Sequence, residues 1–504
     1  MLPNRRKFLR RSSAFAAGLG LGDLGFLCRL PQVSAAESAV PTNLVRFSPD
    51  IEPLVRFLED TPRERLLEEV AARIHSGLTY REILTALLLA GVRNIQPRPV
   101  GFKFHSVLVI NSAHLASLSS PDSDRWLPIF WALDSFKSGQ AADVREGDWT
   151  MAAPTGSKLP SASQARKAFA EAMDNWDEAA ADVAVVGLAR TAGAQEIFEI
   201  FCRYGMRDFR DIGHKAIFVA NSWRTLQAIG WQHAEPVLRS LAYALLERGR
   251  DPNPAKADLE ADRPWRYNLA AVGKIRADWL GGKPDSSISA ELLELLRHAS
   301  PNEASAKVVE LLNQGLAPQS VWDAVFDSAG ELLVRRPGIL SLHAMTTANA
   351  LHFAFQNSAN DETRRLLLLQ NAAFLTLFRG DADKLKPFQL DELKPLNGKE
   401  KESPPIDEIF AEMSRDRFQA AGKTLAWLQK NPDPKAFINA ARRLIFLKGN
   451  NAHDYKFSSA VLEDYYNVSP SWRERYLAAS VFNLRGSGEP DNSLVERTRV
   501  ALGA

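Results

Sequence analysis

Apolar residues recur every three or four positions along most of the chain and almost never alternate with polar ones, a pattern typical of packed α-helices. The stretch Val107-Leu108-Val109-Ile110 is the one run that favours a strand. Because it lies inside a longer apolar segment without flanking turn residues, we predict that it is helical too. The segments with helical spacing are 102–118, 124–138, 162–174, 177–190, 193–204, 214–228, 232–248, 264–280, 287–299, 302–315, 317–335, 340–357, 361–379, 405–430, 434–448, 453–467 and 470–484.

Two helix starts are marked by their capping residues. Thr61-Pro62-Arg63-Glu64 combines a capping threonine, a proline at the first helical position and a glutamate three residues after the threonine. Thr79-Tyr80-Arg81-Glu82 repeats the capping box directly before an apolar run over 83–90. The fold predicted from these patterns is all-α, a large array of packed antiparallel helix pairs.

Changes of composition divide the chain into parts. Residues 37–47 are small and polar and are predicted to form a flexible leader, followed by a helical domain over 48–379. Residues 380–404 are rich in Lys, Asp, Glu and Pro, which predicts a charged linker or surface insertion before a C-terminal helical part, 405–504, that packs on the main domain. Residues 139–161 mix Gly, Asp, Pro and Ser and are a second predicted surface excursion.

The first 36 residues have the features of a twin-arginine signal peptide. Asn4-Arg5-Arg6-Lys7-Phe8-Leu9 resembles the twin-arginine consensus, and a moderately apolar, Gly-rich stretch from 14 to 27 leads to small residues at 34–36 that suit cleavage. This predicts recognition by the twin-arginine translocase, export in the folded state to the periplasm or the extracellular space, and no stable membrane span after cleavage. The alternative is that the segment stays attached as an anchor.

Composition and charge exclude several classes of function. The 504 residues are 45% hydrophobic and 24% charged with a formal charge of +2, so nothing draws the protein to nucleic acid. With Cys28 inside the signal, the mature chain keeps only Cys202. That count excludes an internal disulfide, a thiolate-rich zinc site and an iron–sulfur cluster. Any bound metal therefore needs ligands from His, Asp, Glu, Asn or water.

Three segments share a pattern of histidine and asparagine. They read HSVLVINSAH from His105, HKAIFVANSWR from His214 and HAMTTANALH from His343. In each, an asparagine follows six or seven residues after the first histidine, and a histidine or arginine follows three residues later. On a helix this last pair shares one face, whereas histidines nine residues apart lie on roughly opposite sides. At most one histidine of each nine-residue pair can therefore enter a shared pocket.

The pattern supports two interpretations. Neutral imidazoles bind metals and move protons, so three such helices can line one central cavity. Histidines that bond to neighbouring amides also occur simply as satisfied polar groups in a core. For the first interpretation, His114 and His352 are candidate metal ligands, with Asn111, Asn221 and Asn349 as substrate-binding residues.

Further candidates lie elsewhere in the sequence. His453 and Lys456 stand one turn apart at the start of a predicted helix, where capping by Asp454 is the alternative explanation. Trp223 and Trp231 are candidates to bind a planar substrate, although core packing also explains them. We find no phosphate-binding glycine loop, zinc-protease motif, nucleophile elbow or dinucleotide fingerprint.

The order of these segments resembles the questin oxidase-like family. The residues that carry the resemblance are Gly213-His214-Lys215-Ala216 with Ala220-Asn221, then Leu342-His343-Ala344-Met345-Thr346, and then His453-Asp454-Tyr455-Lys456. The resemblance covers roughly residues 75–485, and Met345 and Tyr455 depart from the smaller or aliphatic residues expected there. It implies an all-helical oxygenase-type enzyme that acts on polycyclic aromatic ketones or related molecules.

The leading hypothesis is an exported oxidoreductase of the oxygenase type that acts on an aromatic or polycyclic ketone-like small molecule. The sequence does not identify a cofactor, and the candidate is a transition metal bound by histidine. The alternatives are a non-enzymatic helical-repeat scaffold that binds a ligand or partner and a metal-dependent hydrolase. Under the leading hypothesis the catalytic candidates are His214, His343, His453, Lys456 and Arg224.

Overall fold

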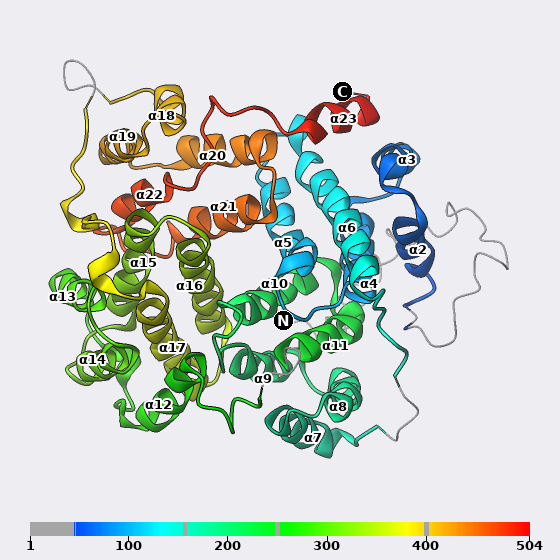
Figure 1. Ribbon diagram of the computed structural model, residues 1–504, viewed down its shortest axis with the longest axis horizontal. Coiled ribbons are helices and arrows are strands. Elements are labelled where there is room, and N and C mark those ends of the chain that lie inside the picture. The colour runs from blue at the N-terminus through cyan, green and yellow to red at the C-terminus, as the bar shows by residue number, and fades with distance from the viewer. Residues whose placement is uncertain (1–44, 46, 155–158, 247–251, 398–402, 504) are drawn as a thin grey trace, which may run out of the picture.

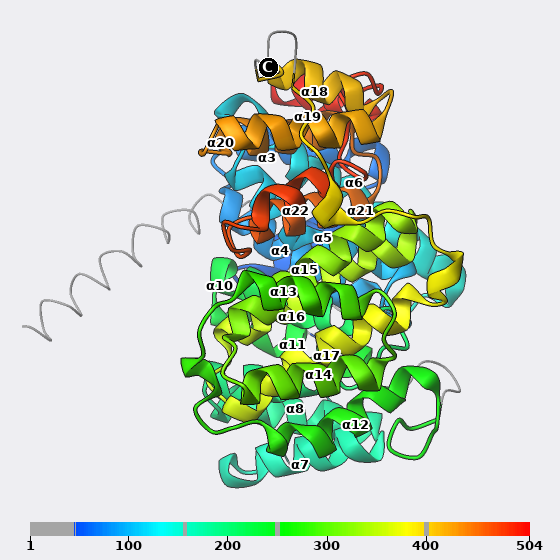
Figure 2. The same cartoon turned by 90° about the vertical axis from the view of Figure 1, so that its left-hand side faces the viewer.

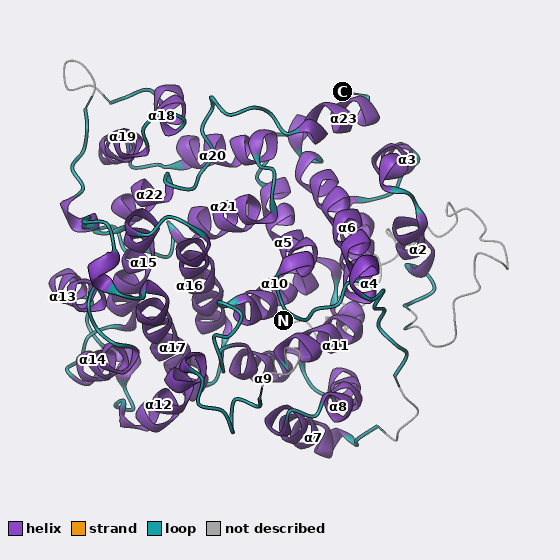
Figure 3. Cartoon of the chain, viewed as in Figure 1, coloured by secondary structure: helices purple, strands orange, loops and turns teal. Residues whose placement is uncertain are grey.

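The chain folds almost entirely into α-helices. The computed structural model describes residues 45, 47–154, 159–246, 252–397 and 403–503. Within these ranges it has twenty-two α-helices, several short 3-10 turns and no β-strand beyond one isolated bridge between Lys283 and Leu316 (Figure 3). The all-α prediction is confirmed, and the stretch Val107 to Ile110 lies within helix α5. The predicted signal peptide and most of the leader lie outside the described residues.

The helices follow one another along the chain with connections of very different lengths. Those of the first half are α2 (Glu52–Asp60), α3 (Arg63–His75), α4 (Tyr80–Asn94), α5 (His105–Leu118), α6 (Leu127–Glu146), α7 (Ala162–Asn175), α8 (Glu178–Thr191), α9 (Ala194–Gly205), α10 (His214–Ile229) and α11 (Ala234–Leu245). Those of the second half are α12 (Arg263–Ala271), α13 (Ser286–Leu296), α14 (Pro301–Asn313), α15 (Pro318–Arg335), α16 (Ile339–Asn357), α17 (Asp361–Arg379), α18 (Ile406–Met413), α19 (Arg417–Lys430), α20 (Lys435–Lys448), α21 (Ala452–Asp464), α22 (Arg473–Ser480) and α23 (Ser493–Leu502). No described helix is both long enough and apolar enough to cross a membrane.

Four helices from distant parts of the chain form a closed ring at the centre of the molecule. α5 packs on α10, α10 on α16, α16 on α21, and α21 back on α5 (Figure 1). Most residues of α5, α10 and α16 are buried, as expected for segments that are apolar on all sides. The ring therefore forms the interior of the fold, and other helices cover it.

Several of the most extensive contacts join consecutive helices, among them α5 with α6, α7 with α8, and α16 with α17, and others join helices further apart in the chain, such as α14 with α17. In the view of Figure 2, α18, α19 and α20 lie at one end of the molecule, and α7 and α12 lie at the other. The C-terminal helices α21 and α22 pack against the rest of the fold, because α21 completes the ring and α22 contacts α15.

The local predictions at helix ends have mixed outcomes. Thr79 and Glu82 form the predicted capping box at the start of α4. The prediction that Thr61 caps the next helix is wrong, because its hydroxyl donates to the carbonyl of Phe57 and the residue ends α2 instead. The first part of the predicted excursion 139–161 is also helical, since α6 continues to Glu146. Gly139 lies where a Cβ would clash with Ser106 of α5, so this glycine allows two helices to pack closely.

The predicted linker 380–404 is held against the body of the protein over its described residues. Leu390 is fully buried, and its backbone N–H donates to the carboxylate of Glu331 on α15 at 3.0 Å. The segment contains only short 3-10 turns. It is therefore a packed surface insertion, which is one of the two forms that its composition allowed.

Candidate metal centre

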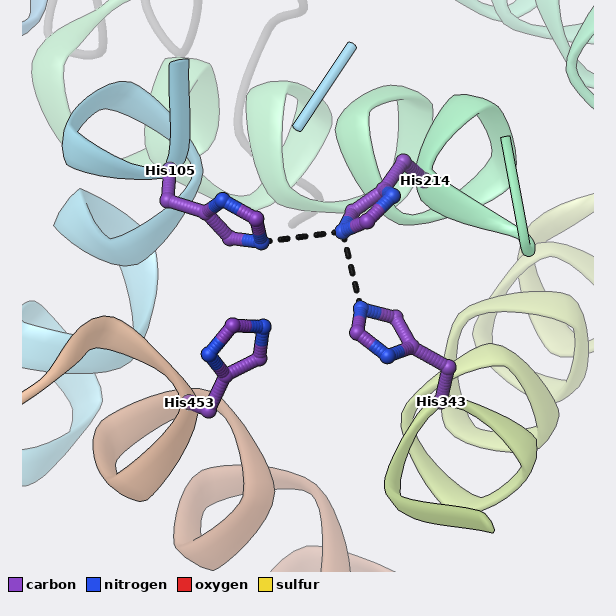
Figure 4. Close-up of side chains that lie close together, drawn as sticks. All are labelled: His105, His214, His343 and His453. Carbon is purple, nitrogen blue, oxygen red and sulfur yellow. Dashed lines mark hydrogen bonds between the residues drawn. The ribbon is translucent and has the colours of Figure 1, made fainter. Parts of the chain in front are cut away.

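Four histidines meet at the centre of the ring, one from each of its helices. His105 is the first residue of α5, His214 is the first of α10, His453 is the second of α21, and His343 is the fifth of α16. Each contributes a ring nitrogen, and these nitrogens all lie within 4.8 Å of one another. Figure 4 shows the four rings facing a common point from four helices. The meeting point lies at the N-terminal ends of the helices.

The closest contacts in this histidine cluster join the same type of nitrogen. The Nε2 atom of His214 lies 3.0 Å from Nε2 of His105 and 2.8 Å from Nε2 of His343. The ring of His453 completes the group, with its centroid 4.5 Å from that of His105 and 5.2 Å from that of His343. The Nε2 atom of His453 is buried and has no hydrogen-bond partner among the described residues.

The outer nitrogens of three of these rings are held by the backbone. A carbonyl oxygen only accepts hydrogen bonds, so each of these Nδ1 atoms carries the ring proton, and each Nε2 atom keeps a lone pair. Lone pairs that face one another at about 3 Å repel each other, and a cation bound by both nitrogens would remove that repulsion. A histidine that donates its Nδ1 proton to a carbonyl is the usual form of a metal ligand. The three contacts are His105 to Phe102 at 2.8 Å, His214 to Asp211 at 2.8 Å and His343 to Ile339 at 2.7 Å.

Two glycines allow the loops before α5 and α10 to close around the rings. Gly101 has φ +141°, and a Cβ at this position would lie 3.2 Å from Cε1 of His214 and 3.7 Å from Cε1 of His105. Gly213 has φ +85°, and a Cβ there would clash with the side chain of Thr347 on α16. Both the backbone conformation and the lack of space favour glycine here. These positions fix where His105 and His214 enter the cluster.

The environment keeps the imidazoles neutral. Burial, together with the nearby charge of Lys456, lowers the pKa of all four histidines, to about 3 for His453 and well below the usual value for His214 and His343. Neutral imidazole is the form that binds metal ions. Iron, copper, zinc and nickel all accept such ligands, and among the described residues no carboxylate or thiolate belongs to this cluster.

Lys456 is buried one turn after His453 on α21. Its Nζ atom has no hydrogen-bond partner among the described residues, and burial lowers its pKa to about 7. The side-chain oxygen of Asn111 on α5 is also buried without a partner in the described part of the chain. Polar atoms left unpaired in a protein interior are costly unless a ligand or water completes them.

The structure brings His214, His343 and His453 together and adds His105, which the sequence analysis did not select. The repeated pattern contained the signal for it, because His105 stands at the front of its segment exactly as His214 and His343 do in theirs. A nine-residue step places only one histidine of each pair at the centre, and the leading one enters in both cases.

The prediction that His114 and His352 are metal ligands is wrong for this cluster, because both lie outside it. The Nδ1 atom of His114 lies 2.9 Å from the hydroxyl of Tyr80. His352 packs against Trp322 and Phe326, with ring centroids 4.7 and 5.1 Å away. The helical rotation over nine residues turns both side chains away from the centre.

The three predicted asparagines join the helices of the ring to one another. The amide of Asn111 donates to the side-chain oxygen of Asn221 at 3.4 Å, and Asn221 donates to the carbonyl of Leu108 at 3.0 Å. Asn111 and Asn221 follow the cluster histidines of their helices by six or seven residues, which is about 10 Å along the helix axis. Asn111 and Asn221 therefore link α5 to α10.

Asn349 and Arg224 belong to a second polar group that links α10, α16 and α21. Arg224 donates to the side-chain oxygen of Asn349 at 3.1 Å and to Glu463 at 2.7 Å. Asn349 donates to Glu463 at 2.7 Å and to Asp464 at 2.8 Å. The guanidinium of Arg224 is thus already paired within the fold.

The two predicted substrate-binding tryptophans pack against each other instead of facing the histidine cluster. The ring centroids of Trp223 and Trp231 lie 5.0 Å apart, and Trp223 also lies 4.4 Å from Phe198 of α9. Such close aromatic packing is what a hydrophobic core provides.

Fold and site together define a class: an all-α protein with a cluster of four histidines, of which His214 and His343 are buried and His105 and His453 are partly buried. No family model, no curated protein and no solved structure matches this chain. The resemblance to questin oxidase-like proteins stays a prediction, and the geometry of the histidine cluster is the observation that bears on function.

Proposed function

We propose that this protein is a metalloenzyme in which His105, His214, His343 and His453 bind one transition-metal ion. The observation that carries the proposal is the convergence of Nε2 atoms at 2.8 and 3.0 Å, each on a ring whose other nitrogen donates to a backbone carbonyl. A core histidine that serves only to satisfy polarity has no reason to direct its lone pair at two others.

We propose further that the enzyme is an oxidoreductase of the oxygenase type that acts on an aromatic or polycyclic ketone-like molecule. Four imidazoles fill a tetrahedral zinc site, whereas a hydrolytic zinc ion keeps one position for water. A metal that accepts six ligands, such as iron, keeps two positions beside four histidines for oxygen and substrate. The ligand count therefore favours redox chemistry, and the questin oxidase-like resemblance suggests the substrate class.

Lys456 and Asn111 are the residues that we assign to the substrate. Both have buried polar atoms without partners among the described residues, and Lys456 lies one turn from His453. A buried amine next to the reacting centre stabilises negative charge that develops on a substrate oxygen. Arg224 is less suited to that role, because Glu463 and Asn349 already engage it.

The proposed place of action is the periplasm or the extracellular space, after transport by the twin-arginine translocase. This part rests on the sequence pattern of residues 4–9. Transport in the folded state suits a buried centre of this kind, because the metal is inserted before the ring of helices closes around it.

The direct test is metal analysis of protein purified from the export compartment. We expect about one iron or copper ion per chain in the wild type and its loss in His214→Ala and His343→Ala. His352→Ala is the matched control, because His352 is a buried histidine on the same helix as His343 but lies outside the cluster. An equal loss of metal from all three variants would show a general loss of folding.

Oxygen consumption with a panel of hydroxylated aromatic ketones tests the activity. Uptake that depends on the metal and is lost in Lys456→Met supports the proposal. A wild-type protein that holds no transition metal contradicts it and leaves a helical scaffold as the better interpretation. A metal-loaded protein that hydrolyses esters without consuming oxygen would favour the hydrolase.

A further inference from the structure

Two residues that precede cluster histidines have a backbone conformation that their side chains disfavour. Phe102 has φ +43° and stands three residues before His105, and Ile212 has φ +44° and stands two residues before His214. Positive φ is uncommon for residues other than glycine and is a genuine outlier for a bulky or β-branched side chain. Local backbone strain is therefore concentrated directly before α5 and α10.

The other described non-glycine residues with positive φ have ordinary explanations. Trp176 has φ +65° at the C-terminal end of α7, where a left-handed residue commonly ends a helix. Asp148 has φ +52° at an exposed position just after α6, and aspartate tolerates this region better than most residues. Phe102 and Ile212 neither end a helix nor have short polar side chains, so the strain at these two positions needs another cause.

Each strained residue sets the direction of a carbonyl that holds a histidine. The carbonyl of Phe102 accepts from Nδ1 of His105 at 2.8 Å. The peptide bond between Asp211 and Ile212 carries the carbonyl that accepts from Nδ1 of His214, also at 2.8 Å. The flanking φ and ψ angles determine how a planar peptide unit is turned. A return of either strained residue to negative φ would therefore swing the carbonyl away from its imidazole.

Packing of the two side chains contributes little toward offsetting the strain. Phe102 is 70% exposed, and Ile212 is only partly buried. A strained backbone persists only where the surrounding interactions hold it. The rings that the two turns hold have Nε2 atoms only 3.0 Å apart, a contact that is repulsive without a cation. In the metal-free protein this repulsion adds to the strain, and a bound ion reverses it.

We infer that Phe102 and Ile212 are positioning residues of the metal site, and that the bound ion holds their strained turns in place. This inference rests on the proposed function, because the ion is what offsets the strain. In the loaded protein the ion draws His105 and His214 together, and the hydrogen bonds from their Nδ1 atoms keep both carbonyls in the observed direction. In the metal-free protein the turns relax toward negative φ and the two histidines separate, which opens the site to the entering ion.

The inference predicts that relief of the strain tightens metal binding. Phe102→Asn and Ile212→Asn introduce a residue that adopts positive φ more readily, so the ion no longer binds against the strain. Titration of the metal-depleted protein with cobalt(II), followed by visible absorption, gives the affinity. We expect each variant to bind cobalt(II) about fivefold more tightly than the wild type or better, which corresponds to about 1 kcal/mol of relieved strain.

Two control variants separate strain from other effects of substitution. Phe102→Leu keeps an apolar side chain and the strained backbone, so its affinity for cobalt(II) should equal that of the wild type. Asp148→Gly removes a non-glycine residue with positive φ outside the cluster and should also leave the affinity unchanged. Damage to the fold would weaken metal binding, whereas the inference requires that binding becomes tighter.

Amide hydrogen exchange tests the two turns directly. The N–H of Phe104 donates to the carbonyl of Gly101 at 2.7 Å, and the N–H of His214 donates to that of Asp211 at 2.9 Å. We expect both turns to exchange at least tenfold more slowly in the cobalt-loaded wild type than in the metal-free protein. Helix α19, which lies outside the ring, is the internal reference and should exchange at the same rate in both.

The outcomes separate this inference from the metalloenzyme proposal. If both asparagine variants bind cobalt(II) as the wild type does, or more weakly, the inference is overturned and the metalloenzyme proposal stays intact. Exchange in the two turns that does not slow on loading overturns it as well. A wild-type protein that binds no transition metal overturns the metalloenzyme proposal and this inference with it.

Discussion

The Nε2 atoms of His214 and His343 lie 2.8 Å apart, although the two residues are separated by 129 positions in the sequence. Both rings donate their Nδ1 protons to backbone carbonyls, so lone pairs face each other across this gap. Without a cation the contact is repulsive, and with one it becomes two bonds. The first turns of α10 and α16 are therefore expected to depend on the metal for their stability.

Metal removal is accordingly predicted to lower the melting temperature. A ligand present at a thousand times its Kd stabilises a fold by about 4 kcal/mol, and a chelator withdraws that contribution. Thermal unfolding of the wild type with and without chelator measures the shift. His343→Ala should show almost no chelator effect, whereas His352→Ala should keep it. A chelator effect of equal size in both variants would place the metal elsewhere.

Gly101 offers a test of how tightly the loop before α5 fits the cluster. In Gly101→Ala the new methyl group would meet the ring of His214 at 3.2–3.3 Å in a backbone conformation that alanine disfavours. Gly147 has the same φ of +141° but nothing within 4 Å of a Cβ, so Gly147→Ala carries the backbone strain alone. Such strain costs on the order of 1–3 kcal/mol.

We predict that both glycine variants lose stability and that only Gly101→Ala weakens metal binding, by at least tenfold. Calorimetric titration of metal-depleted protein with the metal gives the affinity, and thermal unfolding gives the stability. Equal metal affinities in the two variants would mean that the ring of His214 does not need its observed position to bind the metal.

The fold was predictable because its cause is local. The three- and four-residue spacing of apolar positions gave the all-α class, and the capping box at Thr79 gave the start of α4. The predicted excursion began too early, at Gly139, because glycine occurs both in loops and where helices pack closely. Only the contact of Gly139 with Ser106 distinguishes the two cases. Composition alone does not contain that contact.

The site was predictable only in part, for a different reason. Helical geometry limited a shared pocket to at most one histidine of each nine-residue pair, but which one enters depends on how four distant helices close into a ring. The choice of His114 over His105 failed at that step. Asn349 was selected as a substrate-binding residue on the same pattern, but in the structure it pairs with Arg224 and Glu463 and does not face an open pocket.

Export is predicted to depend on the paired arginines of the signal. Changing Arg5 and Arg6 together to lysine keeps the charge but removes the pair that the translocase reads. We expect the protein to accumulate in the cytoplasm, which fractionation and immunoblotting measure. The same change at Arg10 and Arg11 is the matched control and should leave export intact. Normal export of the Arg5, Arg6 variant would rule out the twin-arginine route.

Asp464 gives a prediction for the dependence of stability on pH. This carboxyl is fully buried on α21, and burial, with the adjacent charge of Glu463, raises its pKa to about 8. It accepts from Asn349 at 2.8 Å and from the hydroxyl of Tyr476 at 3.2 Å. In the unfolded chain the pKa of an aspartate is about 3.9. Between these two values the folded protein holds one proton more than the unfolded chain.

The sign of the effect follows from that extra proton. As pH rises from about 4 to about 8, the unfolding free energy falls by roughly 1.4 kcal/mol per pH unit through this group. Asp464→Asn does not titrate and still offers an oxygen to Asn349 and an N–H to Tyr476. The difference in melting temperature between Asp464→Asn and the wild type should therefore change in favour of the variant as pH rises from 5 to 8. Asp433→Asn, which changes an exposed aspartate, is the control. If the melting temperatures of Asp464→Asn and the wild type change equally with pH across this range, Asp464 is ionised in the folded protein. Arg224 would then be the cation that stabilises the ionised carboxylate.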